Sequence, residues 1–195
     1  MTKKRFVSFR DQQKMVGELC RQIANSGWRP DYVVGITRGG LQAAVMISHY
    51  FDVPMHTLKV SLRDDANASE SNLWMAEDAL GTRQERYVED EQDVGAILEA
   101  ASDMLNFNDN YKNILIVDDI NDTGATINWI MNDWQSSCLP DDEGWSEVWN
   151  GNVKFAVLFD NLASKSKIKM DFSAEEIDKD ENPEWIVFPY ENWWA

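Results

Sequence analysis

Short apolar runs alternate with a helical pattern along the first third of the chain, and this alternation restricts the possible folds more than any other feature. The runs at 31–36 (DYVVGI) and 55–62 (MHTLKVSL) have the length of strands, and the segment between them, 41–51 (LQAAVMISHYF), has the length and composition of a helix. A strand, a helix and a second strand at this spacing form a βαβ unit, whose two strands lie parallel in one sheet. The sequence therefore predicts an α/β domain with a central parallel sheet.

A helix is also predicted before this unit, and further strands after it. Ser8 and Asp11 have the spacing of a capping box, and the apolar face that follows predicts a helix ending near Gly27. Toward the C-terminus, apolar runs and helical periodicity predict a strand at 113–117, a helix at 125–134, and strands at 153–159 and 185–189.

The segments between these elements are less regular. The acid-rich segments 139–150 and 171–182 are interpreted as loops, and the pattern is looser over 63–110, where a helix is predicted to run to about residue 106. Neither an internal repeat nor a linker is evident, so we expect one domain over residues 1–195.

The overall charge limits the partners that such a chain can bind. The sequence has 34 Asp and Glu against 18 Lys and Arg, a formal net charge of −16. This balance argues against nucleic-acid partners and against anionic membranes, and an anionic substrate must be held by local groups. There is no apolar run of about 20 residues that would span a membrane, and the two cysteines, Cys20 and Cys138, are expected to be reduced thiols. We therefore expect a cytoplasmic protein.

Three acids follow the apolar run of the stretch 114–127 (ILIVDDINDTGATI) within five residues. Asp118 and Asp119 come where a strand ends, and Asp122 opens the turn into the next helix. Backbone amides at a helix N-terminus attract phosphate, whereas clustered carboxylates accept hydrogen bonds from sugar hydroxyls or bind Mg²⁺. The stretch therefore predicts a site for a sugar phosphate whose leaving group carries a metal ion.

A second turn, 37–40 (TRGG), follows the strand at 31–36. Gly39 and Gly40 allow backbone amides to approach an anion, and Arg38 adds a guanidinium group suited to phosphate oxygens. In an open parallel sheet both turns lie at the carboxyl edge of the strands, where ligands bind. Other motifs do not match: an EF-hand loop begun at Asp119 would have Ile130 at its twelfth position, and the sequence has no nucleotide P-loop and no G-x-G-x-x-G.

These two pieces together resemble the type I phosphoribosyltransferase family. ILIVDDINDTGAT resembles its signature for 5-phosphoribosyl diphosphate (PRPP), VVGITRGGL resembles its pyrophosphate loop, and EWIVFPYE resembles the hood of its 6-oxopurine branch, the xanthine-guanine and hypoxanthine phosphoribosyltransferases. The resemblance implies a type I phosphoribosyltransferase fold: a central parallel sheet flanked by helices, with a small hood and a flexible flap. It places the core at about 28–62 and 111–160, the flap at about 63–110, and the hood at about 161–195 together with the N-terminal segment.

The resemblance also implies a role for each matching residue. Asp122 would be the catalytic acid near N7 of a purine, and Asp118 and Asp119 would bind the ribose hydroxyls, directly or through Mg²⁺. The 5′-phosphate would bind to Thr123, Gly124, Ala125 and Thr126, and the pyrophosphate to Arg38 and Gly39. Trp185 would stack on the base, Ile186 would read its edge through the backbone, and Asn161 could donate to a carbonyl group. In the flap, Arg63, Arg83 and Arg86 would bring charge to the pyrophosphate.

One departure from the branch leaves the base open. The 6-oxopurine enzymes place a Lys just after the strand that matches 153–159, where it contacts the exocyclic oxygen, whereas this chain has Asp160 and Asn161 there, with Lys165 and Lys167 following. The expected activity is Mg²⁺-dependent transfer of phosphoribose from PRPP to guanine, xanthine or hypoxanthine, with release of pyrophosphate. Transfer to another base and a PRPP-binding regulatory protein without turnover are the alternatives. The family's habit suggests a homo-oligomer, either a dimer or a tetramer.

Overall fold

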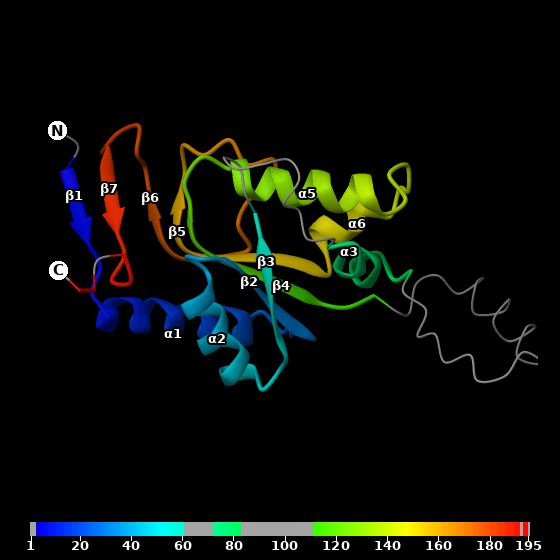
Figure 1. The fold of residues 1–195 in the computed structure, drawn as a ribbon, viewed down its shortest axis with the longest axis horizontal. Coiled ribbons are helices and arrows are strands. Elements are labelled where there is room, and N and C mark those ends of the chain that lie inside the picture. Colours follow the sequence, from blue (N-terminus) through cyan, green and yellow to red (C-terminus); the bar gives the residue numbers. More distant parts are fainter. Residues whose placement is uncertain (1–2, 61–71, 83–110, 192, 195) are drawn as a thin grey trace, which may run out of the picture.

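A five-stranded sheet forms the centre of the molecule in the computed structural model, which describes residues 3–60, 72–82, 111–191 and 193–194 (Figure 1). The strand order is β3-β2-β4-β5-β6, and every neighbouring pair is parallel. The strands are β2 (Tyr32–Thr37), β3 (Met55–Lys59), β4 (Ile114–Asn121), β5 (Val153–Asn161) and β6 (Phe172–Ile177). The predicted parallel sheet is thus confirmed, and β4 extends four residues beyond the predicted strand, so it includes both Asp118 and Asp119.

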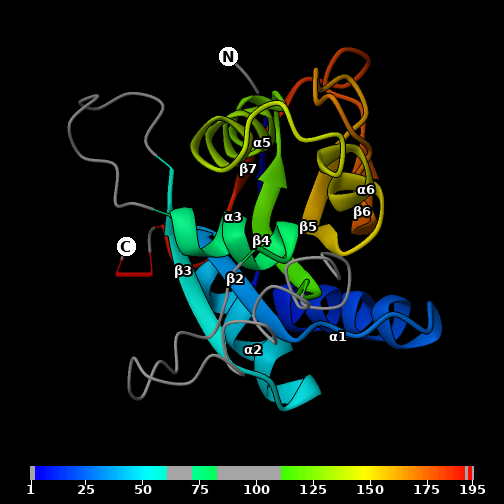
Figure 2. The same cartoon turned by 90° about the vertical axis from the view of Figure 1, so that its right-hand side faces the viewer.

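Helices cover both faces of this sheet (Figures 1 and 2). One face carries α1 (Phe9–Asn25) and α2 (Leu41–Phe51), and the other carries α3 (Leu73–Leu80), α5 (Ala125–Ser137) and α6 (Trp145–Asn150). In β4, Ile114 and Ile116 belong to the apolar cluster with α3, α5 and α6, whereas Leu115 and Val117 belong to the cluster with α1 and α2. A strand buried on both faces needs an uninterrupted apolar run, which explains the sequence ILIV.

The first helix begins as its capping sequence predicts. The backbone N–H of Asp11 donates to Oγ of Ser8 at 3.1 Å, so Ser8 is the N-cap of α1. Val16, Leu19 and Ile23 are buried against the sheet. Gly27 follows the helix with a φ of 76°, a left-handed conformation that glycine adopts without steric cost.

Two short parallel strands, β1 (Lys3–Phe6) and β7 (Glu184–Val187), form a separate two-stranded sheet beside the main one. Both lie at the left end of the molecule in Figure 1, close to the two chain termini. Arg5 of β1 contacts Glu175 of β6 through two hydrogen bonds of 2.5 and 2.7 Å. The N-terminal segment and the C-terminal segment therefore form one unit that is joined to the edge of the main sheet by an ion pair.

Two segments interpreted as loops contain secondary structure. Within 139–150, Trp145, Val148 and Trp149 have the spacing of a helical face, and they bury it as α6 against β5 and α5. Within 171–182, β6 forms the edge of the sheet, where acidic side chains face solvent on one side while Phe172 packs inward. In both cases the acidic residues obscured the sequence pattern of an element that is buried on only one side.

The predicted flap is described only in part. Its middle contains α3, whose Met75, Ala76 and Ala79 are buried in the core. Arg63, Arg83 and Arg86, and the helix predicted to run to about residue 106, lie outside the described residues. Among the helices in the described ranges, none has the length and apolarity needed to cross a bilayer.

Candidate active site

The direction of chain progression reverses between β2 and β4. From β2 the chain moves outward to β3, whereas from β4 it moves the other way to β5 and then β6. At such a reversal the loops that follow the two central strands lead to opposite faces and leave a crevice at the carboxyl edge. The loop after β2 is 38–40 and the turn after β4 is 122–124, so the two turns predicted from the sequence meet at this edge.

The loop after β2 packs directly on the acids of β4. A side chain at Gly39 would overlap with the carboxylate of Asp119, and one at Gly40 would overlap with the backbone carbonyl of Val117. Backbone atoms leave room only for glycine at position 40, and a side chain at position 39 would have to displace the Asp119 carboxylate, which explains the Gly-Gly pair. Arg38 is exposed, and within the described residues its guanidinium group forms no ion pair. It is therefore available to an anionic ligand.

Asp118 and Asp119 place two carboxylates side by side in a partly buried position, where negative charge is energetically unfavourable. Burial, reinforced by the neighbouring Asp119 carboxylate, raises the pKa of Asp118 well above its ordinary value. Burial also raises the pKa of Asp119, and the hydrogen bond from Tyr190 opposes this shift. Among the described residues, neither carboxylate has an ion-pair partner. The pair is thus arranged to accept a cation or hydroxyl donors from a ligand.

Tyr190 contributes the hydrogen bond to the acid pair from the C-terminal segment. Its hydroxyl donates to Oδ2 of Asp119 at 2.5 Å, and its ring stacks on that of Phe188 at 5.5 Å. Burial and the neighbouring carboxylates raise the pKa of Tyr190, so the phenol remains a protonated donor. This residue links the unit formed by β1 and β7 to the acid pair of β4.

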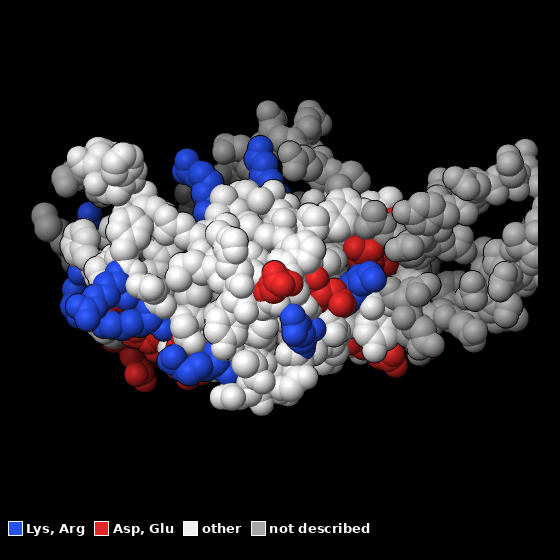
Figure 3. All heavy atoms as spheres, turned by 90° about the horizontal axis from the view of Figure 1, so that it is seen from below, with Lys and Arg blue, Asp and Glu red and all other residues white. Residues whose placement is uncertain are grey.

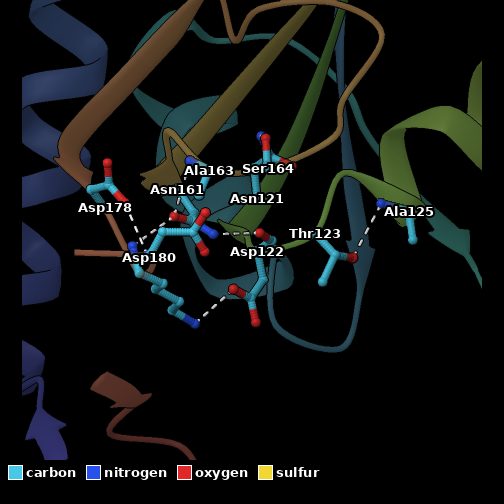
Figure 4. Close-up of polar contacts among 10 residues, drawn as sticks. Asn121, Asp122, Thr123, Ala125, Asn161, Ala163, Ser164, Asp178 and Asp180 are labelled. Atoms are coloured by element: carbon cyan, nitrogen blue, oxygen red, sulfur yellow. Dashed lines mark hydrogen bonds and ion pairs between the residues drawn. The ribbon is translucent and has the colours of Figure 1, made fainter. Parts of the chain in front are cut away.

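The turn after β4 leads into α5 through Gly124, which has a φ of 81°. A side chain there would lie 2.6 Å from the carbonyl carbon of Lys165 and would overlap with the backbone nitrogen of Ser166. Thr123 is exposed and its Oγ1 accepts from the backbone N–H of Ala125 at 3.3 Å (Figure 4). Ala125 is exposed and Thr126 is half-buried at the first turn of the helix. The four predicted phosphate-binding residues thus surround the N-terminus of α5, which favours an anion.

The segment after β5 lies against this turn. The backbone N–H of Lys165 donates to the carbonyl of Thr123 at 3.0 Å, and Nδ2 of Asn128 donates to the carbonyl of Lys165 at 2.9 Å. Oδ1 of Asn128 in turn accepts from the backbone N–H of Lys167 at 2.8 Å. Lys165 and Lys167 therefore accompany the predicted phosphate-binding turn, and both side chains are exposed.

Asp122 is held by Asn161 at the end of β5 (Figure 4) and by Lys179 in the turn after β6. Its backbone carbonyl accepts from Nδ2 of Asn161 at 2.7 Å, and its carboxylate forms an ion pair of 2.7 Å with Nζ of Lys179. Asn161 is buried, and its Oδ1 accepts from the backbone N–H groups of Ala163 and Lys179. Asn161 therefore fixes the position of Asp122, and only one N–H of its amide is left for a ligand.

Trp185 and Ile186 lie on β7 with opposite environments. The Trp185 side chain is 55% exposed, whereas Ile186 is 5% exposed and packs in the apolar cluster with α1 and α2. An exposed indole ring has a face available for stacking on a planar ligand. The buried side chain of Ile186 leaves its backbone as the part that could contact one.

The donor set suits Mg²⁺ held jointly by protein and ligand. Carboxylate oxygens such as those of Asp118 and Asp119 are ligands that Mg²⁺ prefers, and protein Mg²⁺ sites often combine one or two carboxylates with substrate phosphates. In the described part of the chain there is no group of three or more His, Cys, Asp or Glu side chains that would hold a metal ion by itself. The residues present therefore fit a metal ion that arrives with an oxygen-rich ligand.

The surface charge is uneven despite the acidic composition. Figure 3 shows Lys and Arg gathered at the end of the molecule where β1 and β7 lie, which is also the end toward which the strands of the main sheet run. Exposed cations on β1 and α1 include Lys3, Lys4, Arg10 and Lys14. Positive charge at this end favours the approach of an anionic ligand that the whole molecule would otherwise repel.

Two residues of this site were not predicted from the sequence. Lys179 lies in the segment interpreted as an acidic loop, and Tyr190 belongs to the stretch EWIVFPYE, which resembles the hood as a whole. The signal for Lys179 is that it is the only cation in 171–182. The position of Tyr190 depends on how the C-terminal segment folds back over β4, which no local pattern specifies.

Comparisons with known proteins agree with this geometry. The sequence matches the family model of the phosphoribosyl transferase domain over residues 9–191. No curated protein matches the sequence.

Three solved structures share the fold. They are a purine phosphoribosyltransferase from Pyrococcus horikoshii Ot3 (18% identity, 97% of this chain and 95% of that chain, TM-score 0.59), the xanthine-guanine-hypoxanthine phosphoribosyltransferase of Helicobacter pylori (19%, 98% and 95%, 0.60), and a hypothetical protein from Neisseria gonorrhoeae with bound ppGpp (20%, 98% and 90%, 0.58). At these identities the structural likeness establishes the fold, and the match of the family model over nearly the whole chain establishes the family. The chain belongs to the phosphoribosyltransferase family of enzymes.

Proposed function

We propose that this enzyme transfers phosphoribose from Mg²⁺-bound PRPP to a 6-oxopurine, such as guanine, xanthine or hypoxanthine, and releases pyrophosphate. The proposal rests mainly on one observation: carboxylates and a helix N-terminus lie at the same edge of the sheet. The carboxylates of Asp118 and Asp119 suit the ribose and its metal ion, while the N-terminus of α5 suits the 5′-phosphate. PRPP presents these groups on one molecule.

In this proposal each of the two loops binds a different part of PRPP. The ribose hydroxyls would donate to Asp118 and Asp119, and the backbone amides near Gly124 would donate to the 5′-phosphate. Arg38 and the amide of Gly39 would hold the pyrophosphate, to which Mg²⁺ would supply further charge neutralisation as it leaves. Binding the substrate at three separate points fixes the anomeric carbon relative to the base.

Asp122 would act at the reacting centre. Departure of pyrophosphate leaves positive charge on the ribose ring, and a nearby carboxylate stabilises that charge. The same carboxylate could accept the proton that N7 of the purine loses as the new bond forms. The half-exposed side chain of Asp122, with its backbone fixed by Asn161, suits a group that must meet a ligand in a defined position.

The base would bind between this acid and β7. Trp185 would stack on the purine ring, and the backbone at Ile186 would contact its edge. Asn161 would support this site chiefly by positioning Asp122, with one amide N–H remaining for a base carbonyl. We expect the same chain to assemble as a homo-oligomer and to function in the cytoplasm.

The decisive experiment measures pyrophosphate release with PRPP, Mg²⁺ and a panel of guanine, xanthine, hypoxanthine, adenine and uracil. We expect turnover with at least one 6-oxopurine, and loss of turnover when EDTA removes the metal ion. Tight binding of PRPP without turnover of any base would instead indicate a regulatory protein.

The role of Asp122 is tested by Asp122→Asn, with Asp180→Asn as a control for loss of an exposed carboxylate in the same region. Asp122→Asn should lower kcat by roughly 10²- to 10³-fold, with little change in the Kd of PRPP. A fully active Asp122→Asn protein would remove this residue from the mechanism.

A further inference from the structure

The proposed function leaves the chemistry of Lys179 unused. Its ammonium group lies 2.7 Å from the carboxylate of Asp122, and the Lys179 side chain is only 17% exposed. A lysine normally extends into solvent, so a largely covered ammonium group beside a candidate catalytic acid needs an explanation.

The position of Lys179 is fixed by the same side chain that fixes Asp122. Oδ1 of Asn161 accepts from the backbone N–H of Lys179 at 3.0 Å, while Nδ2 of Asn161 donates to the carbonyl of Asp122 at 2.7 Å. The pairing of β5 with β6 brings Asn161 opposite Ile177, two residues before Lys179. One buried amide thus holds the acid and the cation in a constant relationship.

The chemistry of a purine makes this relationship informative. In a 6-oxopurine, N7 and the exocyclic oxygen at C6 lie on the same edge of the ring. If Asp122 lies near N7, as the proposed function requires, a cation next to Asp122 is placed near the exocyclic oxygen. Lys179 has three N–H donors and no acceptor, so it can bond a carbonyl oxygen but would repel the amino group of adenine.

The residues at the end of β5 lead to the same conclusion. Related 6-oxopurine enzymes are expected to use a Lys at the end of the strand matching β5, where this chain has Asp160 and Asn161. Here Oδ1 of Asn161 accepts from the backbone N–H of Lys179, whose ammonium group pairs with Asp122. A positive charge is therefore present beside Asp122, and it comes from the turn after β6 instead of the end of β5.

We propose that Lys179 determines base specificity in this enzyme, by donating a hydrogen bond to the exocyclic carbonyl oxygen of a 6-oxopurine and thereby excluding 6-aminopurines. This assignment rests on the proposed function, because it takes the base to lie beside Asp122. It differs from a purely structural role, in which Lys179 would only neutralise Asp122.

The test compares Lys179→Met with the wild type and with Lys169→Met, a control that removes an exposed cation from the same stretch of chain. For guanine or hypoxanthine, Lys179→Met should raise the KM of the base and lower kcat/KM by roughly 10- to 100-fold. The KM of PRPP and the behaviour of Lys169→Met should not change. The ratio of kcat/KM for the 6-oxopurine to kcat/KM for adenine should fall by a similar factor. Lys179→Arg should restore part of this ratio.

A structural role predicts a different pattern. Loss of charge neutralisation alone would change kcat equally for all bases and leave the ratio of 6-oxopurine to adenine unchanged, which would overturn the proposal. Thermal melting of each variant separates these effects from a failure to fold.

Binding measurements keep this test separate from that of the proposed function. If the wild-type protein turns over no base, the proposed function fails, and the affinities of GMP and AMP measured by calorimetry then decide the role of Lys179. A preference for GMP over AMP that falls at least tenfold in Lys179→Met supports the assignment. If the ratio of the GMP and AMP affinities is the same in the wild type and in Lys179→Met, the proposed role of Lys179 is refuted.

Discussion

Gly124 offers the sharpest test of how the predicted phosphate-binding turn is built. Its φ of 81° is a left-handed conformation, and a Cβ atom would meet backbone atoms of Ser166 and Lys165 that belong to the segment after β5. Backbone cannot rotate away as a side chain can. Gly124→Ala should therefore displace the whole segment 164–167 from the turn.

The expected destabilisation has two parts. An alanine in the left-handed region costs about 1 kcal/mol after the entropy lost by the unfolded chain is included. Displacing the segment also breaks the hydrogen bond of 3.0 Å between Lys165 and Thr123 and the one of 2.9 Å between Asn128 and Lys165, each worth about 1 kcal/mol. The sum is about 3 kcal/mol, which corresponds to a fall in Tm of roughly 6 to 12 °C for a chain of this size.

Gly27→Ala is the matched control. Gly27 has almost the same backbone conformation, with a φ of 76°, but a Cβ atom there would have no neighbour within 4 Å. This variant should lose only the conformational part, about 1 kcal/mol or 2 to 4 °C in Tm, and should bind PRPP normally. Urea melts and calorimetric titration with Mg²⁺-PRPP measure both quantities.

We expect Gly124→Ala to weaken PRPP binding at least tenfold, because the turn and the segment that supports it would move together. If the two alanine variants melt at the same temperature and bind PRPP equally, the contact between Gly124 and 165–166 has no energetic role. The reasoning that this segment supports the phosphate-binding turn would then be wrong.

Three further predictions concern the predicted pyrophosphate loop, the acids and the aromatic residues. Gly39→Ala should push the carboxylate of Asp119 aside and reduce PRPP affinity at least tenfold, and unchanged affinity in calorimetry would contradict this packing. Burial raises the pKa of Asp118, so the folded protein holds this proton to higher pH than the unfolded chain, and stability falls as pH rises between the two values. Asp118→Asn should therefore raise the Tm of the metal-free protein at neutral pH while abolishing PRPP binding; a lower Tm would refute the assignment. Trp134→Ala should lower the free energy of unfolding by about 3 to 5 kcal/mol, whereas Trp185→Ala should change it by less than about 1 kcal/mol yet raise the KM of the base.

The meeting of the two candidate loops was predictable because the residues of each loop are local in sequence and the topology is simple. Asp118, Asp119 and Asp122 follow one strand, and Arg38 and Gly39 follow another. Parallel strands place their carboxyl ends at one edge, so two loops about 80 residues apart in the chain had to meet there once the sheet was predicted correctly. The prediction needed no knowledge of side-chain packing.

Lys179 and Tyr190 could not be predicted in the same way. Lys179 reaches Asp122 only because β6 pairs with β5 in one register, and β6 itself was hidden by acidic side chains that suit an edge strand. Tyr190 reaches Asp119 only because the C-terminal segment folds back along β1. Contacts of this kind depend on the register of distant elements, which hydrophobic periodicity does not specify.

The helix α6 was not predicted from the sequence for a different reason. Trp145, Val148 and Trp149 show the spacing of a helical face, and the indole N–H of Trp145 donates to the carbonyls of Cys138 and Leu139 as the helix begins. The periodic signal was present over only six residues and was surrounded by acids, so composition outweighed it. An aromatic residue at every third or fourth position in an acidic segment is better interpreted as a short helix packed on its indole rings.

The two acidic groups of the site are compensated in different ways, and this difference separates their roles. Asp122 already has a cation, Lys179, so its charge is balanced before any ligand binds. Asp118 and Asp119 have neutral donors, including the Tyr190 hydroxyl and the backbone N–H of Asp119, and no cation among the described residues, so their burial remains unfavourable in the free protein. In the proposed function a metal-bound ribose would relieve that unfavourable charge, and this relief would contribute to the affinity for Mg²⁺-PRPP. Asp122 would gain little from the same ligand, which agrees with the proposed role of this acid at the base and at the anomeric carbon.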